Sequence, residues 1–148
     1  MSNDGEIYPA AYPAHPAHSG HPARTAAALA GLLLVSGTAH LTVPGPFDAI
    51  VPHALPGRAR WWTYLSGVAE LAVGAAVAVP GTRRRGAAAA AGLFAAVLPA
   101  NVQMARDWRD RPLPLRAVAY GRLPLQVPLV LWARRVRREA QPSSQPSG

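Results

Sequence analysis

Apolar positions along this chain fall into four long blocks separated by short polar or proline-rich stretches. The blocks cover residues 25–43, 61–80, 86–105 and 113–133, and are apolar or small almost throughout. A helix of about 20 residues crosses a hydrocarbon core about 30 Å thick. The pattern therefore predicts an all-α protein, a four-helix transmembrane bundle. A soluble four-helix bundle is the alternative, but its helices would show polar faces, and the run "AAAAAGLFAAVLPA" has none.

The segments outside the blocks are predicted to be tails and turns. Residues 1–24 repeat Tyr-Pro-Ala and His-Pro-Ala units, which indicate a disordered tail before a membrane domain at 25–135, and 136–148 form a second disordered tail. Histidines recur every third residue in the first tail, at His15, His18 and His21, but they lack acidic or cysteine partners. We therefore expect no metal site.

Composition strengthens the membrane interpretation. Of the 148 residues, 50% are hydrophobic and only 15% are charged, whereas about a quarter are charged in soluble domains. All 15 basic residues are arginine, and they flank the apolar blocks rather than forming one basic face, so nucleic-acid binding is not expected. The absence of cysteine excludes disulfides and thiolate chemistry in this chain. A cleaved signal peptide with Gly37-Thr38-Ala39 as its cleavage site is a weaker alternative to an uncleaved first helix.

The arginines also predict an orientation. With both termini on the cytoplasmic side, the clusters "RRR" and "RRVRR" lie on that side, where arginine is favoured. The two opposite loops carry fewer arginines. We therefore expect a multi-pass protein with cytoplasmic termini and with the bilayer as its main partner.

Polar side chains inside the apolar blocks are the candidates for function, because an ionisable group in hydrocarbon must be paired or serve a site. Helical spacing of four residues places Ser36 with His40, Ser66 with Glu70, and Arg122 with Gln126; Asn101 and Gln103 follow Pro99, which we expect to kink its helix. Gly37, Gly67 and Gly74 would allow close helix approach.

Depth within the bilayer predicts which of these groups meet. Glu70 and Arg122 lie at comparable depth and are expected to pair, with Gln126 and Ser66 satisfying the remaining donors and acceptors. His40 and Asn101 would form a shallower polar layer. Three interpretations stay open: a structural ion pair, an outward-facing site, or an Arg122 that reaches the headgroups from a later helix start.

The loop "PGPFDAIVPHALP" is predicted to form a short structured cap on the outer surface. Its His53 and Asp48 could face the same entrance as His40. The alternative is that His53 is simply solvated.

The sequence as a whole resembles the DoxX-like family of small bacterial membrane proteins over roughly residues 25–135. The resemblance rests on "SGTAHLTVPGPFDAIVPHALP", "WWTYLSGVAEL", "LPANVQMARD" and "RLPLQVPLVLWA". It implies a four-helix protein of the bacterial cytoplasmic membrane. Some relatives are associated with redox-linked membrane complexes, including a thiosulfate:quinone oxidoreductase, but no catalytic residue can be matched onto this chain.

Two functions follow as hypotheses. The first is an accessory subunit of a redox-linked membrane complex, with a partner protein or a second copy of the chain. The second is a quinone-linked oxidoreductase component with Glu70, Arg122 and His40 as candidate catalytic residues. In that case the candidate quinone-binding residues are Ser66, Asn101, Gln126 and His53. A carrier is less favoured, because four short helices leave little room for alternating access.

Overall fold

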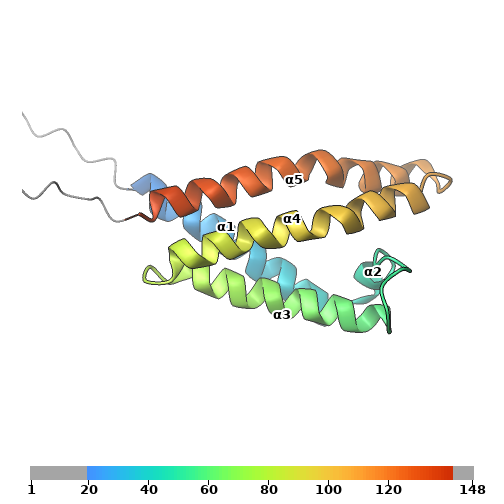
Figure 1. Cartoon of the computed structure of the whole chain (residues 1–148), viewed down its shortest axis with the longest axis horizontal. Helices are drawn as coiled ribbons and strands as arrows, with labels where there is room; N and C mark the ends of the chain where they lie inside the picture. The colour runs from blue at the N-terminus through green and yellow to red at the C-terminus, as the bar shows by residue number, and fades with distance from the viewer. Residues whose placement is uncertain (1–19, 142–148) are drawn as a thin grey trace, which may run out of the picture.

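The computed structural model describes residues 20–141, and every long element in that range is a helix. The helices are α1 (Gly20–Thr42), the short α2 (Gly45–Asp48), α3 (Ala59–Ala78), α4 (Arg83–Asp107) and α5 (Leu113–Glu139) (Figure 1). No strand occurs among the described residues. The predicted all-α class is therefore confirmed.

The four long helices form two closely packed pairs. α1 packs along α3, and α4 packs along α5, while the α3 to α4 contact joins one pair to the other. The hydroxyl of Thr25 donates to Oε2 of Glu139 at 2.8 Å, so α1 begins where α5 ends, and the first and last described residues both lie at that end of the bundle (Figure 1). The turns give the helices an up-down arrangement.

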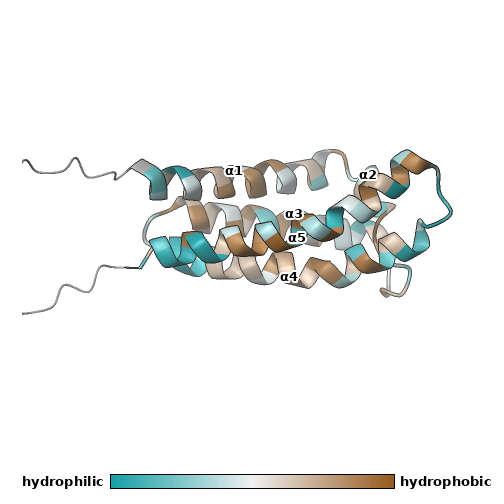
Figure 2. Ribbon diagram, turned by 90° about the horizontal axis from the view of Figure 1, so that it is seen from above, coloured by the Kyte–Doolittle hydropathy of each residue, from teal (hydrophilic) through white to brown (hydrophobic). Residues whose placement is uncertain are grey.

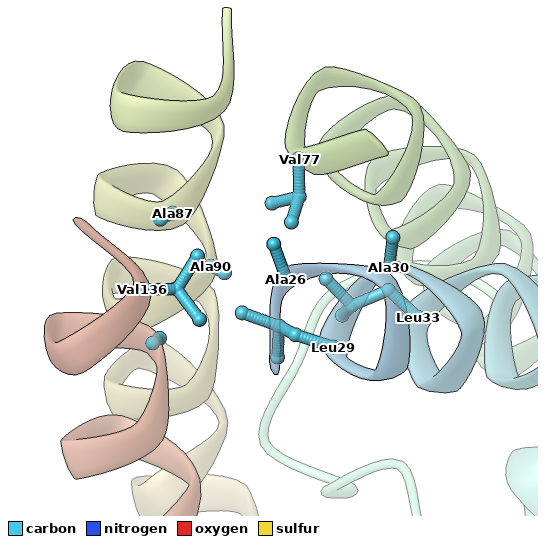
Figure 3. Close-up of a cluster of buried hydrophobic side chains, with 9 residues drawn as sticks. Ala26, Leu29, Ala30, Leu33, Val77, Ala87, Ala90 and Val136 are labelled. Carbon is cyan, nitrogen blue, oxygen red and sulfur yellow. The ribbon is translucent and has the colours of Figure 1, made fainter. Parts of the chain in front are cut away.

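The main apolar core lies near the end where α1 begins. It is a cluster of nine buried, mostly small residues from all four long helices (Figure 3): Ala26, Leu29, Ala30, Leu33, Val77, Ala87, Ala90, Ala133 and Val136. The α3 to α4 turn closes this end tightly, because a Cβ on Gly86 would lie 2.6 Å from the carbonyl carbon of Ala76. Small side chains thus let the two pairs meet here.

Toward the α2 end the apolar core is smaller. A second cluster there joins α4 to α5 through Met104, Ala105 and Ala119, with Ile50 of the segment after α2 packed against it. The main core, by contrast, draws on all four long helices. The two pairs are therefore less tightly sealed together at this end, which is where the candidate site lies.

Large hydrophobic side chains are abundant on the outside of the bundle. They include Val35, Leu65, Val68, Leu125, Val127 and Leu131, each more than half exposed. Two helices, His21–Thr42 and Arg83–Asp107, are long and apolar enough to cross a membrane, and only 28% and 22% of their apolar windows are buried. The core helix of a soluble protein would instead be mostly buried. Figure 2 shows hydrophilic residues gathered toward the two ends of the bundle.

The helix bounds differ from the predicted ones at several ends. α1 begins at Gly20, inside the stretch predicted to be a disordered tail, and α5 continues to Glu139 rather than ending at residue 133. The arginines near the end of α5 are thus helical, because the helix continues past the apolar block. The predictions for residues 1–19 and 142–148, including His15 and His18, lie outside the described residues.

Three prolines lie within long helices without ending them. Pro99 lies inside α4, and Pro124 and Pro128 lie inside α5. Each removes one backbone hydrogen-bond donor. Helix continuity through these positions keeps Asn101 and Gln126 on long helices, where they meet.

Candidate ligand-binding cavity

A partly open cavity of about 710 Å³ lies between the two helix pairs at the α2 end. Ligand sites commonly have volumes of about 300–1,000 Å³ and mainly apolar walls with a few polar groups. Its apolar wall includes Phe47, Ile50, Val51, Leu55, Trp62, Leu65, Leu93 and Val97, and its polar groups include Ser36, His40, Thr63, Ser66, Glu70, Asn101, Gln103 and Arg122. Five of the seven candidate catalytic and ligand-binding residues proposed from sequence line this cavity. A sixth, Gln126, lies beside it in contact with the cavity-lining Asn101.

His40 of α1 and Glu70 of α3 form the central polar contact of the cavity. Nδ1 of His40 lies 3.4 Å from Oε2 of Glu70, and the two side chains are only 12% and 14% exposed. The same Nδ1 lies 2.8 Å from the carbonyl oxygen of Ser36. A carbonyl oxygen can only accept, so Nδ1 carries the proton of this hydrogen bond. Nε2 is then the ring nitrogen left for other contacts.

Glycine brings the two helices together at this contact. A Cβ on Gly67 of α3 would lie 2.9 Å from Cβ of His40, so the histidine occupies space that only glycine leaves open. Gly37 of α1 lies in the same way against the backbone of Gly67 and the side chain of Leu71. The Ser-Gly-x-Ala frame that precedes both His40 and Glu70 thus pairs with itself across an antiparallel interface, as the predicted close approach requires.

One oxygen of the Glu70 carboxylate lacks a hydrogen bond. Oε2 is buried and has no hydrogen-bond partner among the described residues. A buried polar atom without a partner costs about 1–3 kcal/mol, more when it is charged. Glu70 therefore carries a buried, unsatisfied acceptor on a side chain that lines the cavity.

Phe47 of α2 covers the other side of the His40 ring. The two ring centroids are 3.8 Å apart and the ring planes meet at 27°. Sequence reasoning placed Phe47 in a cap but did not assign it to the site. Its signal was present, because Phe47 is the one aromatic residue in the proline-rich loop "VPGPFDAIVPHALP".

Asp48 anchors the cap to α3 rather than facing the cavity entrance. Its two carboxylate oxygens accept hydrogen bonds from the hydroxyl of Thr63 at 2.6 Å and from Nε of Arg60 at 2.7 Å. The Thr63 hydrogen bond, followed by the Arg60 contacts, lowers the pKa of Asp48 below its ordinary value of 3.8. This clasp holds α2 and Phe47 in place.

The predicted ion pair between Glu70 and Arg122 does not form. Among the described residues Glu70 contacts His40 instead, and Arg122 of α5 lines the cavity without an ion pair. The cause is the helix arrangement, because α3 packs on α1 and α4 while α5 packs chiefly on α4. Equal depth placed Glu70 and Arg122 at one level but on helices that are not close neighbours.

Asn101 and Gln126 form a second polar contact, between α4 and α5. Nδ2 of Asn101 donates to Oε1 of Gln126 at 3.2 Å, and Nε2 of Gln126 donates to the carbonyl oxygen of Phe94. Both side chains are buried. Gln126 was predicted to serve Glu70 and Arg122, but it satisfies Asn101 instead, so each helix pair has its own polar contact.

Two further predicted residues, Ser66 and His53, differ in their relation to the cavity. Ser66 lines the cavity, whereas His53 is exposed and only its neighbours Pro52 and Ala54 line the wall. The solvated alternative for His53 is therefore the one observed. Within residues 20–141, no group of three or more His, Cys, Asp or Glu side chains could hold a metal ion.

A family model described as "Domain of unknown function (DUF8561)" matches residues 29–137. No curated protein and no solved structure matches the chain. The matched range contains α3, α4, the cap and most of α1 and α5, and with them the whole cavity wall. The chain therefore belongs to the DUF8561 family, a family of unknown function.

Proposed function

We infer that this protein is a multi-pass membrane protein whose cavity binds a lipophilic small molecule with a hydrogen-bond-donating head group. The observation that carries the proposal is the buried Oε2 of Glu70, which lies 3.4 Å from Nδ1 of His40 but accepts no hydrogen bond among the described residues, on a side chain that lines the cavity. A carboxylate kept in such a place is costly unless something satisfies it. A ligand hydroxyl or N–H group would do so.

The apolar surface supports a membrane setting with four spans. Among the described helices only α1 and α4 contain a continuous stretch long and apolar enough to qualify as a span, whereas α3 carries Glu70 and two tryptophans and α5 carries arginines and prolines. Both are nevertheless at least 20 residues long, and both present largely exposed leucine and valine side chains. A bundle with this surface is stabilised by lipid rather than by water.

The wall chemistry defines the ligand further. Aliphatic and aromatic side chains such as Leu93 and Trp62 would receive an apolar body, and the head group would lie toward His40 and Glu70. Arg122 supplies a guanidinium on the α5 side, suited to an oxygen acceptor on the same head group. Phenolic and alcoholic lipids fit this description, and a quinol, the reduced form of a quinone, is one member of the class.

The test is purification of the full-length protein from native membranes in mild detergent, with mass spectrometry of extracted small molecules and of co-purifying proteins. We expect a lipophilic molecule with at least one O–H or N–H group. Glu70→Gln should weaken its retention by about tenfold or more, because a hydrogen bond to a charged acceptor contributes about 1.5–3 kcal/mol. Glu139→Gln, the same change at the opposite end, is the matched control.

Two results would contradict the proposal. One is a wild-type protein that carries no lipophilic molecule, and the other is retention that Glu70→Gln and Glu139→Gln change equally. Recovery of a stoichiometric partner protein without a small molecule would instead support the accessory-subunit function expected from the resemblance to the DoxX-like family.

A further inference from the structure

Seven arginines on α4 and α5 lie at the end of the bundle where the described chain starts and finishes. They are Arg83, Arg84 and Arg85 at the start of α4, and Arg134, Arg135, Arg137 and Arg138 near the end of α5. This is also a hydrophilic end of the bundle in Figure 2. Like charges this close repel one another, so the contacts of each arginine decide what the cluster can do.

Two of the seven arginines are used within the protein. Arg83 donates through Nε to the carbonyl oxygen of Val77 and through Nη2 to that of Ala78, and so satisfies the end of α3. Arg135 donates to Oε1 of Glu139 at 2.7 Å. Both have structural partners, and neither is free for a ligand.

Three of the remaining arginines converge on one pocket. Arg84, Arg85 and Arg137 line a cavity of about 530 Å³ together with Pro80, Gly81 and Ala140. The three come from two different helices, and none of them forms an ion pair within the described part of the chain. Arg134 and Arg138 lie outside its lining.

We propose that this pocket of Arg84, Arg85 and Arg137 binds a phosphate group, as carried by the head of an anionic phospholipid or by a free phosphate. Guanidinium groups bind phosphate oxygens in pairs of parallel hydrogen bonds, and two helices presenting three such groups can enclose one phosphate. The adjoining surface is consistent with a lipid source, because exposed Leu131 lies on α5 with Arg137, and exposed Val79 directly follows α3 beside the turn to α4. Basic pockets between membrane helices are a recurrent setting for such head groups.

The site is separate from the ligand cavity. The residues of the two pockets do not overlap, and the first lies at the α2 end whereas the second is formed by the α3 to α4 turn and the end of α5. Failure of one proposal therefore leaves the other untouched.

The experiment uses the full chain in detergent and follows binding of phosphatidylglycerol by native mass spectrometry, with phosphatidylcholine as the neutral comparison. The test variant is Arg84→Gln with Arg137→Gln, and the control is Arg134→Gln with Arg138→Gln, which removes the same charge from the same end. We expect the test variant to bind phosphatidylglycerol about tenfold more weakly, since bidentate contacts are lost, and the control to remain within about threefold of wild type. Arg84→Lys with Arg137→Lys keeps the charge and should restore binding only in part.

Competition with inorganic phosphate separates the two sources. If millimolar phosphate fails to displace phosphatidylglycerol, the lipid head group is the ligand; if it displaces the lipid fully, the pocket is a phosphate site that does not need the acyl chains. Equal weakening in the test and control variants would overturn the proposal, because it would mean that diffuse charge rather than this pocket attracts the lipid. Unchanged binding in both variants would overturn it as well.

Discussion

Gly37 of α1 and Gly67 of α3 lie directly against each other where their helices cross. A Cβ added to Gly37 would come within 2.8 Å of the carbonyl oxygen of Gly67, and one added to Gly67 within 3.0 Å of the carbonyl oxygen of Gly37. This mutual contact sets the distance between α1 and α3. It thereby brings His40 and Glu70, each three residues further along its own helix, within ion-pair distance.

Gly67→Ala should therefore destabilise the bundle and disturb the cavity. The new methyl would meet Cβ of His40 at 2.9 Å, so the helices must separate or the histidine must shift. Overpacking of this kind typically costs about 1–3 kcal/mol. Thermal unfolding in detergent measures the loss of stability.

Gly31→Ala is the matched control, because it lies on α1 with nothing within 4 Å of an added Cβ. Alanine is a better helix former than glycine by about 1 kcal/mol, so this variant should be at least as stable as wild type. If both variants melted alike, close packing at Gly67 would not be what holds α1 to α3.

The sequence predicted the local features of this interface but not which residues pair across it. Spacing of four residues placed Ser36 with His40, and small residues placed the close approach at Gly37 and Gly67, because both depend only on helix geometry. The partner of Glu70 depends on which helices are neighbours. Depth along the bilayer normal contains no such information, so Arg122 was chosen where His40 is found.

Phe47 was missed for a different reason. Its contact with His40 depends on the path of the proline-rich segment between α1 and α3, which is fixed by the clasp of Asp48 to Thr63 and Arg60. That clasp joins residues on two different helices, and no periodicity in the sequence indicates which residues will pair. The long apolar helices, in contrast, follow from composition alone.

The contact between Asn101 and Gln126 should stabilise the α4 and α5 pair. Gln126→Leu removes the acceptor of Asn101 and the donor to the Phe94 carbonyl, and leaves a buried amide without its partner. We expect a loss of about 1–3 kcal/mol in the free energy of unfolding. Denaturation in mixed detergent micelles provides the measurement.

Gln103→Leu makes the same chemical change at a less critical place on the same bundle. Gln103 donates to Asp107 in an exposed hydrogen bond within α4, so the variant should stay within about 0.5 kcal/mol of wild type. A double variant, Asn101→Leu with Gln126→Leu, should recover part of the loss, because no unpaired amide is left behind. An additive loss in the double variant would show that the two amides do not act on each other.

Acid should release the cap through Asp48. The pKa of Asp48 is lowered in the folded protein, by Thr63 first and then by Arg60, so the clasp contributes stability above the ordinary value of 3.8 and loses it as the pH falls through the folded value. An environment-sensitive dye on Ala54→Cys reports the opening, since the chain has no other cysteine. We expect the dye to become more exposed only below about pH 4.

Asp48→Asn should leave the same dye exposed already at neutral pH. Glu139→Gln is the control, because the pKa of Glu139 is also lowered, by Arg135 and then Thr25, but that clasp lies at the other end of the bundle. A dye transition that followed Glu139 instead of Asp48 would point to global acid unfolding rather than opening of the cap.

The number of membrane crossings can be read from three single cysteines in this cysteine-free chain. Ala54→Cys reports the α2 to α3 segment, Gly81→Cys the α3 to α4 turn, and Asp110→Cys the α4 to α5 turn, and all three positions are exposed. Gly57 is avoided, because its φ of 86° is strained for any other residue. Labelling of intact cells with a membrane-impermeant maleimide, before and after permeabilisation, gives the side of each position.

Four spans place positions 54 and 110 on one side and 81 on the other. If only α1 and α4 crossed the bilayer, 54 and 81 would share a side and 110 would lie opposite. The two arrangements thus differ in whether positions 54 and 81 lie on the same side of the membrane. Labelling of both positions from the same side would exclude the four-span bundle. We expect 54 and 110 to be labelled from outside and 81 only after permeabilisation, because the arginine-rich α3 to α4 turn favours the cytoplasmic side.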